Sequence, residues 1–211
     1  MKQTKGMLIA LEGGEGAGKT TQLARLTKRL DEAGQKVVAM REPGGTAISE
    51  QIREIVLSNK NTGMQETTEV LLFQAARAQI YAEVVIPALK EGKIVLMDRT
   101  RDSSVVYQGI VRGFGRKLIE QLNDISTQKT TPNLTILLDV DVEIGLGRRN
   151  GTGTMNRLDL ENGGFHQKVR TAYLQLAKEN QGKRWLVVDA NRQKDEVEEM
   201  LWQILAKRLK R

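Results

Sequence analysis

A glycine-rich loop between an apolar strand and a helix constrains this chain more than any other feature. The apolar residues 8–11 lead into Gly13, and four residues later the chain reads Gly18-Lys19-Thr20. This spacing fits G-x-x-x-x-G-K-[ST], in which backbone N–H groups cradle a polyphosphate at a helix N-terminus. In that pattern the lysine reaches the β- and γ-phosphates and the threonine hydroxyl binds Mg²⁺. The predicted phosphate-binding residues are Gly13, Gly14, Glu15, Gly16, Ala17, Gly18, Lys19, Thr20 and Thr21.

The length and composition limit the class of protein. A chain of 211 residues, 28% charged and 39% hydrophobic, is long enough for one well-buried globular domain. The absence of cysteine excludes disulfides, thiolate metal sites and cysteine nucleophiles. No apolar run has the length of a membrane span, and the run after residue 6 is too short for a signal-peptide core. We therefore expect a cytoplasmic protein with no membrane partner.

The net charge of +7 has two interpretations. One is nucleic-acid binding, and the other is a phosphate-rich small ligand together with the basic tail at residues 207–211. Only 4% of the residues are aromatic, which offers little for stacking on single strands. Because arginines cluster beside the motifs, we favour the small ligand. A nucleotide-dependent nucleic-acid-binding protein is the alternative from a different class.

Alternating strand and helix patterns predict an α/β fold. Short apolar runs at residues 7–11, 37–40, 94–97, 134–140 and 185–188 are typical of buried parallel strands. Helices are expected at residues 19–33, 47–57, 66–89, 103–108, 117–126, 141–150, 165–181 and 193–210. This order predicts one doubly wound domain over residues 1–211, with a five-stranded parallel sheet and helices on both faces. The glycine-rich segment at about residues 148–164 is the candidate for a mobile lid.

Charged side chains follow several of the predicted strands. Open parallel sheets bind ligands at the carboxyl ends of their strands, where Asp98 and Arg99 are expected. An acid at this position is typical of a carboxylate near Mg²⁺, so we place Asp98 with Thr20 at a metal. Among other residues, the pattern alone favours Phe73 as a core residue, and it predicts His166 on a solvated helix face.

The arginines indicate a small kinase rather than a hydrolytic switch. Phosphoryl transfer between two phosphorylated substrates depends on positioning and on positive charge. An acceptor phosphate is expected on Arg41, Arg53 and Arg99. The lid arginines that can close on the transferring group are Arg148, Arg149 and Arg157.

Further motifs extend over nearly the whole chain. They are Leu11-Glu12-Gly13 with the loop, Arg41-Glu42-Pro43-Gly44-Gly45-Thr46, Glu50 with Ile52-Arg53, Leu71-Leu72-Phe73 with Ala76-Arg77-Ala78-Gln79, Asp98-Arg99, Ser104 with Tyr107-Gln108-Gly109, Leu138-Asp139-Val140, and Phe165-His166 with Val169-Arg170 and Tyr173-Leu174. In this combination the chain resembles the bacterial thymidylate kinase family. The resemblance implies a P-loop nucleoside monophosphate kinase fold and a homodimer. It also implies transfer of the γ-phosphate of ATP to dTMP with Mg²⁺, for dTTP synthesis. Another small nucleotide or deoxynucleoside kinase is the nearest alternative.

The resemblance implies roles for individual residues. Phe73 stacks on thymine, against the interpretation from pattern alone, and Tyr107 packs under the sugar. The implied dTMP-binding residues are Glu42, Arg53, Phe73, Arg77, Arg99, Ser104, Tyr107 and Gln108, with Arg77 and Gln108 on the base and Arg53 and Arg99 on the monophosphate. The implied catalytic residues are Glu15, Lys19, Arg99, Arg149 and Arg157.

The catalytic arginine distinguishes two layouts of the family. One layout carries it inside the phosphate-binding loop, whereas the other supplies it from the lid. Small residues, Gly16-Ala17, occupy the loop here, so the resemblance implies a lid arginine, Arg157 or Arg149. The chain departs from the family at Thr100, where an aromatic residue is usual, and at Asn156, where an acidic residue is common.

Overall fold

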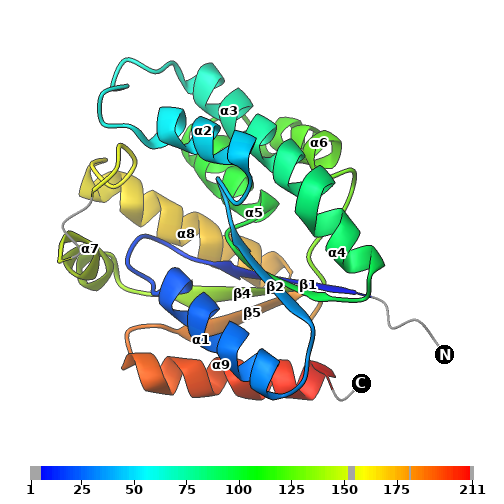
Figure 1. Cartoon of the computed structure of the whole chain (residues 1–211). Coiled ribbons are helices and arrows are strands. Elements are labelled where there is room, and N and C mark those ends of the chain that lie inside the picture. The colour runs from blue at the N-terminus through cyan, green and yellow to red at the C-terminus, as the bar shows by residue number, and fades with distance from the viewer. Residues whose placement is uncertain (1–5, 152–154, 181, 210–211) are drawn as a thin grey trace.

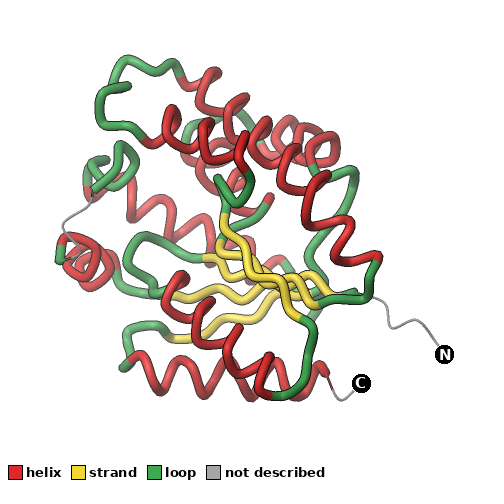
Figure 2. The backbone as a smooth tube through the Cα atoms, in the orientation of Figure 1, coloured by secondary structure: helices red, strands yellow, loops and turns green. Residues whose placement is uncertain are grey.

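A sheet of five parallel strands forms the centre of the computed structural model, which describes residues 6–151, 155–180 and 182–209 (Figures 1 and 2). The strands are β1 (Met7–Glu12), β2 (Val37–Arg41), β3 (Ile94–Asp98), β4 (Leu134–Asp139) and β5 (Trp185–Asp189), in the order β2-β3-β1-β4-β5. The register places Asp98 beside both Leu11 and Arg41, so these strands end at the same edge. The predicted doubly wound sheet is confirmed, and its carboxyl edge brings together the residues that follow each strand.

Helices cover both faces of the sheet, which explains why the strand sequences are continuously apolar. On one face lie α1 (Lys19–Glu32) and α9 (Lys194–Leu209), and on the other lie α3 (Glu66–Ile80), α4 (Ile86–Lys90) and α8 (Gly163–Glu179) (Figure 1). Successive side chains of β1 point to opposite faces of the sheet, as the pleat requires. Ile9 packs into the core with Leu26 and Leu205, whereas Leu8 packs into the core with Ile80.

The remaining helices are α2 (Ala47–Leu57), α5 (Arg101–Ser104), α6 (Arg116–Ser126) and α7 (Val142–Asn150). Two π-helical turns, η1 (Tyr81–Val85) and η2 (Val105–Val111), interrupt the helical segments. The single regular helix predicted over residues 66–89 is therefore wrong, because η1 separates α3 from α4. Such widened turns occur often at functional sites, and η2 carries both Tyr107 and Gln108.

The proposed lid lies between α7 and α8. Residues 152–154 of this segment lie outside the described residues, and residues 155–162 form turns and loops that lead into α8. Across the described ranges, no helix combines the length and the apolar character needed to cross a membrane.

Candidate active site

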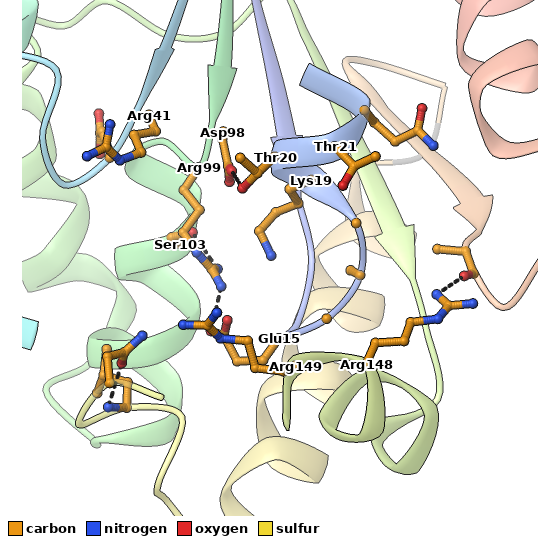
Figure 3. Close-up of a pocket in the computed structure, with 18 of the residues that line it drawn as sticks. Glu15, Lys19, Thr20, Thr21, Arg41, Asp98, Arg99, Ser103, Arg148 and Arg149 are labelled. Atoms are coloured by element: carbon orange, nitrogen blue, oxygen red, sulfur yellow. Dashed lines mark hydrogen bonds and ion pairs between the residues drawn. The ribbon is translucent and has the colours of Figure 1, made fainter. Parts of the chain in front are cut away.

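A cavity of about 680 Å³ lies at the carboxyl edge of the sheet (Figure 3). The predicted site residues that line it are Glu15, Gly16, Ala17, Gly18, Lys19, Thr20, Thr21, Glu42, Arg53, Phe73, Arg77, Asp98, Arg99, Ser104, Tyr107, Gln108 and Arg149. Gly13 and Gly14 lie behind this lining, where their carbonyl groups accept hydrogen bonds from Lys19. Residues from distant parts of the chain therefore share one cavity, and Arg157 is not among them.

The phosphate-binding loop wraps around the side chain of Lys19. The Lys19 Nζ donates to the carbonyl oxygens of Gly13 at 3.0 Å and Gly14 at 2.7 Å. Gly18 precedes α1 with φ of 88°, a conformation that favours glycine. Burial and the nearby Arg99 lower the pKa of Lys19, although Glu15 acts in the opposite direction. A bound polyphosphate would offer this buried ammonium group anionic partners in place of carbonyl oxygens.

Two glycines bring α7 against the loop. A Cβ atom on Gly16 would lie 1.8 Å from the carbonyl oxygen of Gly145, and one on Gly145 would lie 2.4 Å from that of Glu15. Only glycines allow this backbone approach. As a result, α7 is anchored on the loop, and Figure 3 shows its Arg149 beside Glu15. Sequence reasoning missed Gly145, because nothing local in the sequence shows which glycine faces another.

Arg99 joins the loop to the end of β3. Its Nη2 lies 2.6 Å from Glu15 Oε1, and its Nη1 donates to the carbonyl oxygen of Gly13 at 3.1 Å. The Tyr107 hydroxyl donates to the same Glu15 oxygen at 3.1 Å. Burial raises the pKa of Glu15, but Arg99, Lys19 and the Tyr107 hydroxyl outweigh it and lower the pKa to about 2. The Glu15 carboxylate thus pairs with Arg99, the guanidinium group that is predicted to hold a substrate phosphate.

Glu12 is a buried acid that sequence reasoning did not place in the site. Its Oε1 accepts from the Thr100 backbone N–H at 2.8 Å and from the Thr100 hydroxyl at 2.9 Å. Its Oε2 accepts from the Ser103 hydroxyl at 2.6 Å and from the Tyr173 hydroxyl at 2.8 Å. These four donors match the four lone-pair sites of a carboxylate. The departure at Thr100 therefore gives this chain a hydroxyl that helps to satisfy Glu12.

Arg77 is a hub on the acceptor side of the cavity. Its Nε and Nη2 bind Glu42 Oε2 at 2.8 and 2.7 Å, and its Nη1 donates to Ser104 Oγ and Asn123 Oδ1. Nη2 also donates to the Thr100 carbonyl oxygen, so protein groups accept from all five N–H donors. Hydrogen bonding to a base would therefore require Arg77 to exchange a partner. Glu42 Oε1 is buried without a hydrogen-bond partner among the described residues.

Positive charge also gathers near the end of β2. The Arg53 Nη1 donates to the Pro43 carbonyl oxygen at 2.7 Å, and Arg41 pairs with Glu50 at 2.9 Å. Burial and the charge of Arg41 lower the pKa of Arg53. An anion bound between these side chains would relieve this repulsion. Phe73 is half-buried and lines the same cavity. The assignment of Phe73 to the core, made from the pattern alone, is therefore wrong.

Thr20 and Asp98 form the candidate metal site. The Thr20 hydroxyl donates to Asp98 Oδ2 at 2.6 Å, and both residues line the cavity. Hydroxyl and carboxylate oxygens are hard ligands that suit Mg²⁺. Within the described ranges, no three His, Cys, Asp or Glu residues group together as a metal site. The pair fits an ion held by few protein groups together with water and substrate phosphates.

The two candidate lid arginines occupy different places. Arg149 lines the cavity, and its Nε and Nη2 bind Asp159 Oδ2 at 3.0 and 2.7 Å. Arg157 instead donates through Nη2 to Glu69 Oε2 at 2.6 Å and to the Val56 carbonyl oxygen at 3.1 Å. Of the two candidates, the structure brings Arg149 to the phosphate-binding loop.

The other end of the cavity holds Arg148, one of the predicted lid arginines, together with residues that sequence reasoning missed. Arg148 donates to the carbonyl oxygens of Ala190 at 2.8 Å and Asn191 at 3.1 Å, and so ties α7 to the turn after β5. The same turn lines the cavity with Arg192 and Lys194. The rule that ligands bind beyond the carboxyl ends of parallel strands could have identified this turn.

The prediction of a solvated His166 is wrong. The side chain is 5% exposed, and its Nε2 has no hydrogen-bond partner among the described residues. It lies with Gly14, Glu15 and Tyr173 around a small hollow behind the loop. Its neighbour Phe165 is buried as well, because the first turn of α8 directs both side chains inward.

Comparisons with known proteins agree with this geometry. The family model described as thymidylate kinase matches residues 11–201. The thymidylate kinase of Geobacillus sp. (strain WCH70) is 48% identical over 195 residues, 92% of each chain. That of Deinococcus radiodurans is 45% identical over 205 residues, 97% of this chain and 98% of the relative. A crystal structure of thymidylate kinase from Ehrlichia chaffeensis matches with a TM-score of 0.78 at 31% identity, over 95% of this chain and 98% of that one. This chain belongs to the thymidylate kinase family.

Proposed function

We propose that this chain is a dTMP kinase that transfers the γ-phosphate of ATP to dTMP, giving dTDP and ADP. The observation that carries the proposal is the single cavity in which a phosphate-binding loop faces Phe73, Arg53 and Arg99. One side suits a polyphosphate donor, and the other offers an aromatic ring for a base and guanidinium groups for a monophosphate. The family membership favours dTMP as that acceptor.

The donor side holds ATP by its phosphates. The loop N–H groups and Lys19 bind the β- and γ-phosphates, and Thr20 and Asp98 hold Mg²⁺. When bound, Mg²⁺ neutralises charge on the phosphates. In the free protein the Lys19 ammonium group is already directed into the ring of the loop by the carbonyls of Gly13 and Gly14. The site is therefore positioned before the substrate arrives, which lowers the cost of ordering it.

The acceptor side positions dTMP for attack. Arg53 and Arg99 bind the monophosphate, and the phosphate replaces the Glu15 carboxylate on Arg99. Phe73 stacks on the base. The orphaned Oε1 of Glu42 is suited to accept a hydrogen bond from the sugar. Tyr107 packs under the sugar, and Arg77, Ser104 and Gln108 surround the base edge.

The lid segment, residues 148–164, completes the site in this proposal. Arg149 supplies positive charge to the transferring phosphoryl group, since it already lies beside the loop that carries no arginine of its own. Catalysis then consists of positioning and charge stabilisation, without a covalent enzyme intermediate. Excluding water favours transfer to dTMP over hydrolysis of ATP.

An acceptor panel tests the function. The purified protein, with ATP and Mg²⁺, is assayed for ADP release with dTMP, dUMP, dCMP, UMP, AMP and thymidine as separate acceptors. We expect the highest kcat/KM with dTMP, and no dTMP-dependent ADP release from Lys19→Met. Efficient phosphorylation of another acceptor with none of dTMP would refute the proposal.

Because the donor is ATP, we place this activity in the cytoplasm.

We also propose a homodimer, supported by apolar side chains that face solvent on the neighbouring helices α2, α3 and α6. They are Ile48, Ile55, Leu71, Leu118 and Ile125, each at least 45% exposed. A second copy of this surface would cover them, as in a two-fold dimer. Sedimentation should give twice the chain mass of 23.6 kDa. Leu71→Glu should shift the protein to monomer, whereas a wild-type monomer would contradict the proposal.

A further inference from the structure

Glu69 is a buried acid on α3 that neither the sequence analysis nor the proposed reaction uses. Its side chain is 2% exposed. Oε1 accepts from the Gln108 Nε2 at 2.9 Å, and Oε2 lies 2.6 Å from the Arg157 Nη2 and 3.5 Å from the Arg112 Nη2. A carboxylate buried to this extent needs such partners, and here they come from two other segments of the chain, η2 with its cap and the segment before α8.

The contact with Gln108 determines which way its amide group points. A carboxylate has no hydrogen to donate, so only the amide nitrogen of Gln108 can face it. The Gln108 oxygen is on the opposite side of the same planar amide, and Gln108 lines the cavity. Glu69 therefore makes the cavity side of this amide a hydrogen-bond acceptor.

The contact with Arg157 links the same carboxylate to the segment that precedes α8. The Arg157 backbone N–H donates to the Leu57 carbonyl oxygen at 3.1 Å, and its guanidinium group donates to the Val56 carbonyl oxygen. These carbonyl groups belong to the last turn of α2, where they lack partners within the helix. Glu69 and the end of α2 thus hold residue 157 in a fixed place.

We propose that Glu69 is a positioning residue for acceptor selection: it fixes the amide of Gln108 with its oxygen toward the base, and it anchors Arg157 beside the acceptor side of the cavity. This inference rests on the proposed placement of the acceptor base near Gln108. The base of dTMP carries an imide N3–H, which the Gln108 oxygen accepts. The base of dCMP has a lone pair at N3, which meets the same oxygen unfavourably.

The charge-neutral variant Glu69→Gln tests the orientation. A glutamine can accept from or donate to Gln108, so the Gln108 amide can turn its nitrogen toward the base. We expect the ratio of kcat/KM for dTMP to that for dCMP to fall by at least about 10-fold. The matched control is Glu66→Gln, one turn earlier on α3, because Glu66 is 56% exposed and its ion pair among the described residues is a distant 3.8 Å contact with Arg112. That control should keep the wild-type ratio.

A second variant separates orientation from packing. Glu69→Asp keeps a group that can only accept, so it should keep most of the selectivity even where the KM for dTMP rises. A selectivity ratio in folded Glu69→Gln within about 2-fold of wild type, or an equal loss in Glu66→Gln, would overturn the proposal. If neither Glu69 variant folds, titration calorimetry compares the binding of dTMP and dCMP to the wild-type protein. Equal affinities for the two nucleotides would overturn the proposal. Wild-type protein without dTMP kinase activity would instead refute the proposed function.

Discussion

The ion pair between Glu15 and Arg99 leads to a prediction about stability in the absence of substrate. Glu15 receives Arg99 at 2.6 Å and the Tyr107 hydroxyl at 3.1 Å, and its side chain is 16% exposed. The variant Glu15→Gln keeps the shape of the side chain but removes its charge. Arg99 is then left largely buried without its main anionic partner, which is costly.

The magnitude follows from the pKa of Glu15. Lowering this pKa from its ordinary 4.5 to about 2 corresponds to about 3 kcal/mol of folding free energy. Because the folded-state pKa is the lower one, this contribution is complete above about pH 5. It decreases as the pH falls from 4.5 toward 2, and is less than half its full value by about pH 3. At pH 7 we expect Glu15→Gln to unfold about 6–12 °C below the wild type.

Denaturant unfolding at several pH values between 3 and 7, in phosphate-free buffer, measures the effect. The difference in unfolding free energy between wild type and Glu15→Gln should be largest at pH 7 and should shrink below pH 4.5. The exposed Glu120 offers a control, because Glu120→Gln should change stability by less than about 0.5 kcal/mol at any pH. Adding dTMP should restore part of the loss, since its phosphate is proposed to pair with Arg99. A difference that does not depend on pH would refute the reasoning.

Three further predictions concern the reaction itself. Arg149→Ala should lower kcat by about 1,000-fold with little change in the KM for dTMP, and by more than Arg157→Ala does, because Arg149 lies at the loop; steady-state kinetics compare the two. Phe73→Ala should raise the KM for dTMP by about 10-fold or more through loss of stacking, with a smaller change in kcat. Asp98→Asn should raise the Mg²⁺ concentration for half-maximal activity by about 10-fold, measured by titration at fixed ATP, and an unchanged requirement would place the metal elsewhere.

Much of the fold could be predicted because local signals determine it. The apolar runs identified all five strands, and Gly18 before Lys19 marked the start of α1. The turn η1 could not be predicted, because residues 81–85 have the same apolar spacing as a regular helix. A π-helical turn is selected by packing against other elements, and Tyr81 is fully buried there. Periodicity along the chain carries no information about that packing.

The site also contains some residues that local motifs predict and others that they do not. Residues within contiguous motifs, such as Lys19 and Asp98, were predicted for the site from their spacing or their place after a strand, and both line the cavity. Glu12 was missed although it directly precedes the loop, because its partners Thr100, Ser103 and Tyr173 come from segments 88 to 161 residues away. An acid at the end of a buried strand is a weak signal without knowledge of the donors around it.

The two candidate arginines, Arg149 and Arg157, show why spacing alone could not decide which of them approaches the phosphate-binding loop. Arg149 lies near the end of the helix predicted over residues 141–150, and Arg157 follows the glycine-rich break. The sequence does not show where either side chain points. Contacts with distant parts of the chain decide their places. Gly145 lets α7 touch the loop and so directs Arg149 to the cavity, whereas the buried carboxylate of Glu69 holds Arg157 beside Gln108. A buried acid holds each guanidinium group, Asp159 that of Arg149 and Glu69 that of Arg157. Glu69 therefore explains why Arg157 lies away from the phosphate-binding loop, whereas Arg149 remains the candidate that lines the cavity.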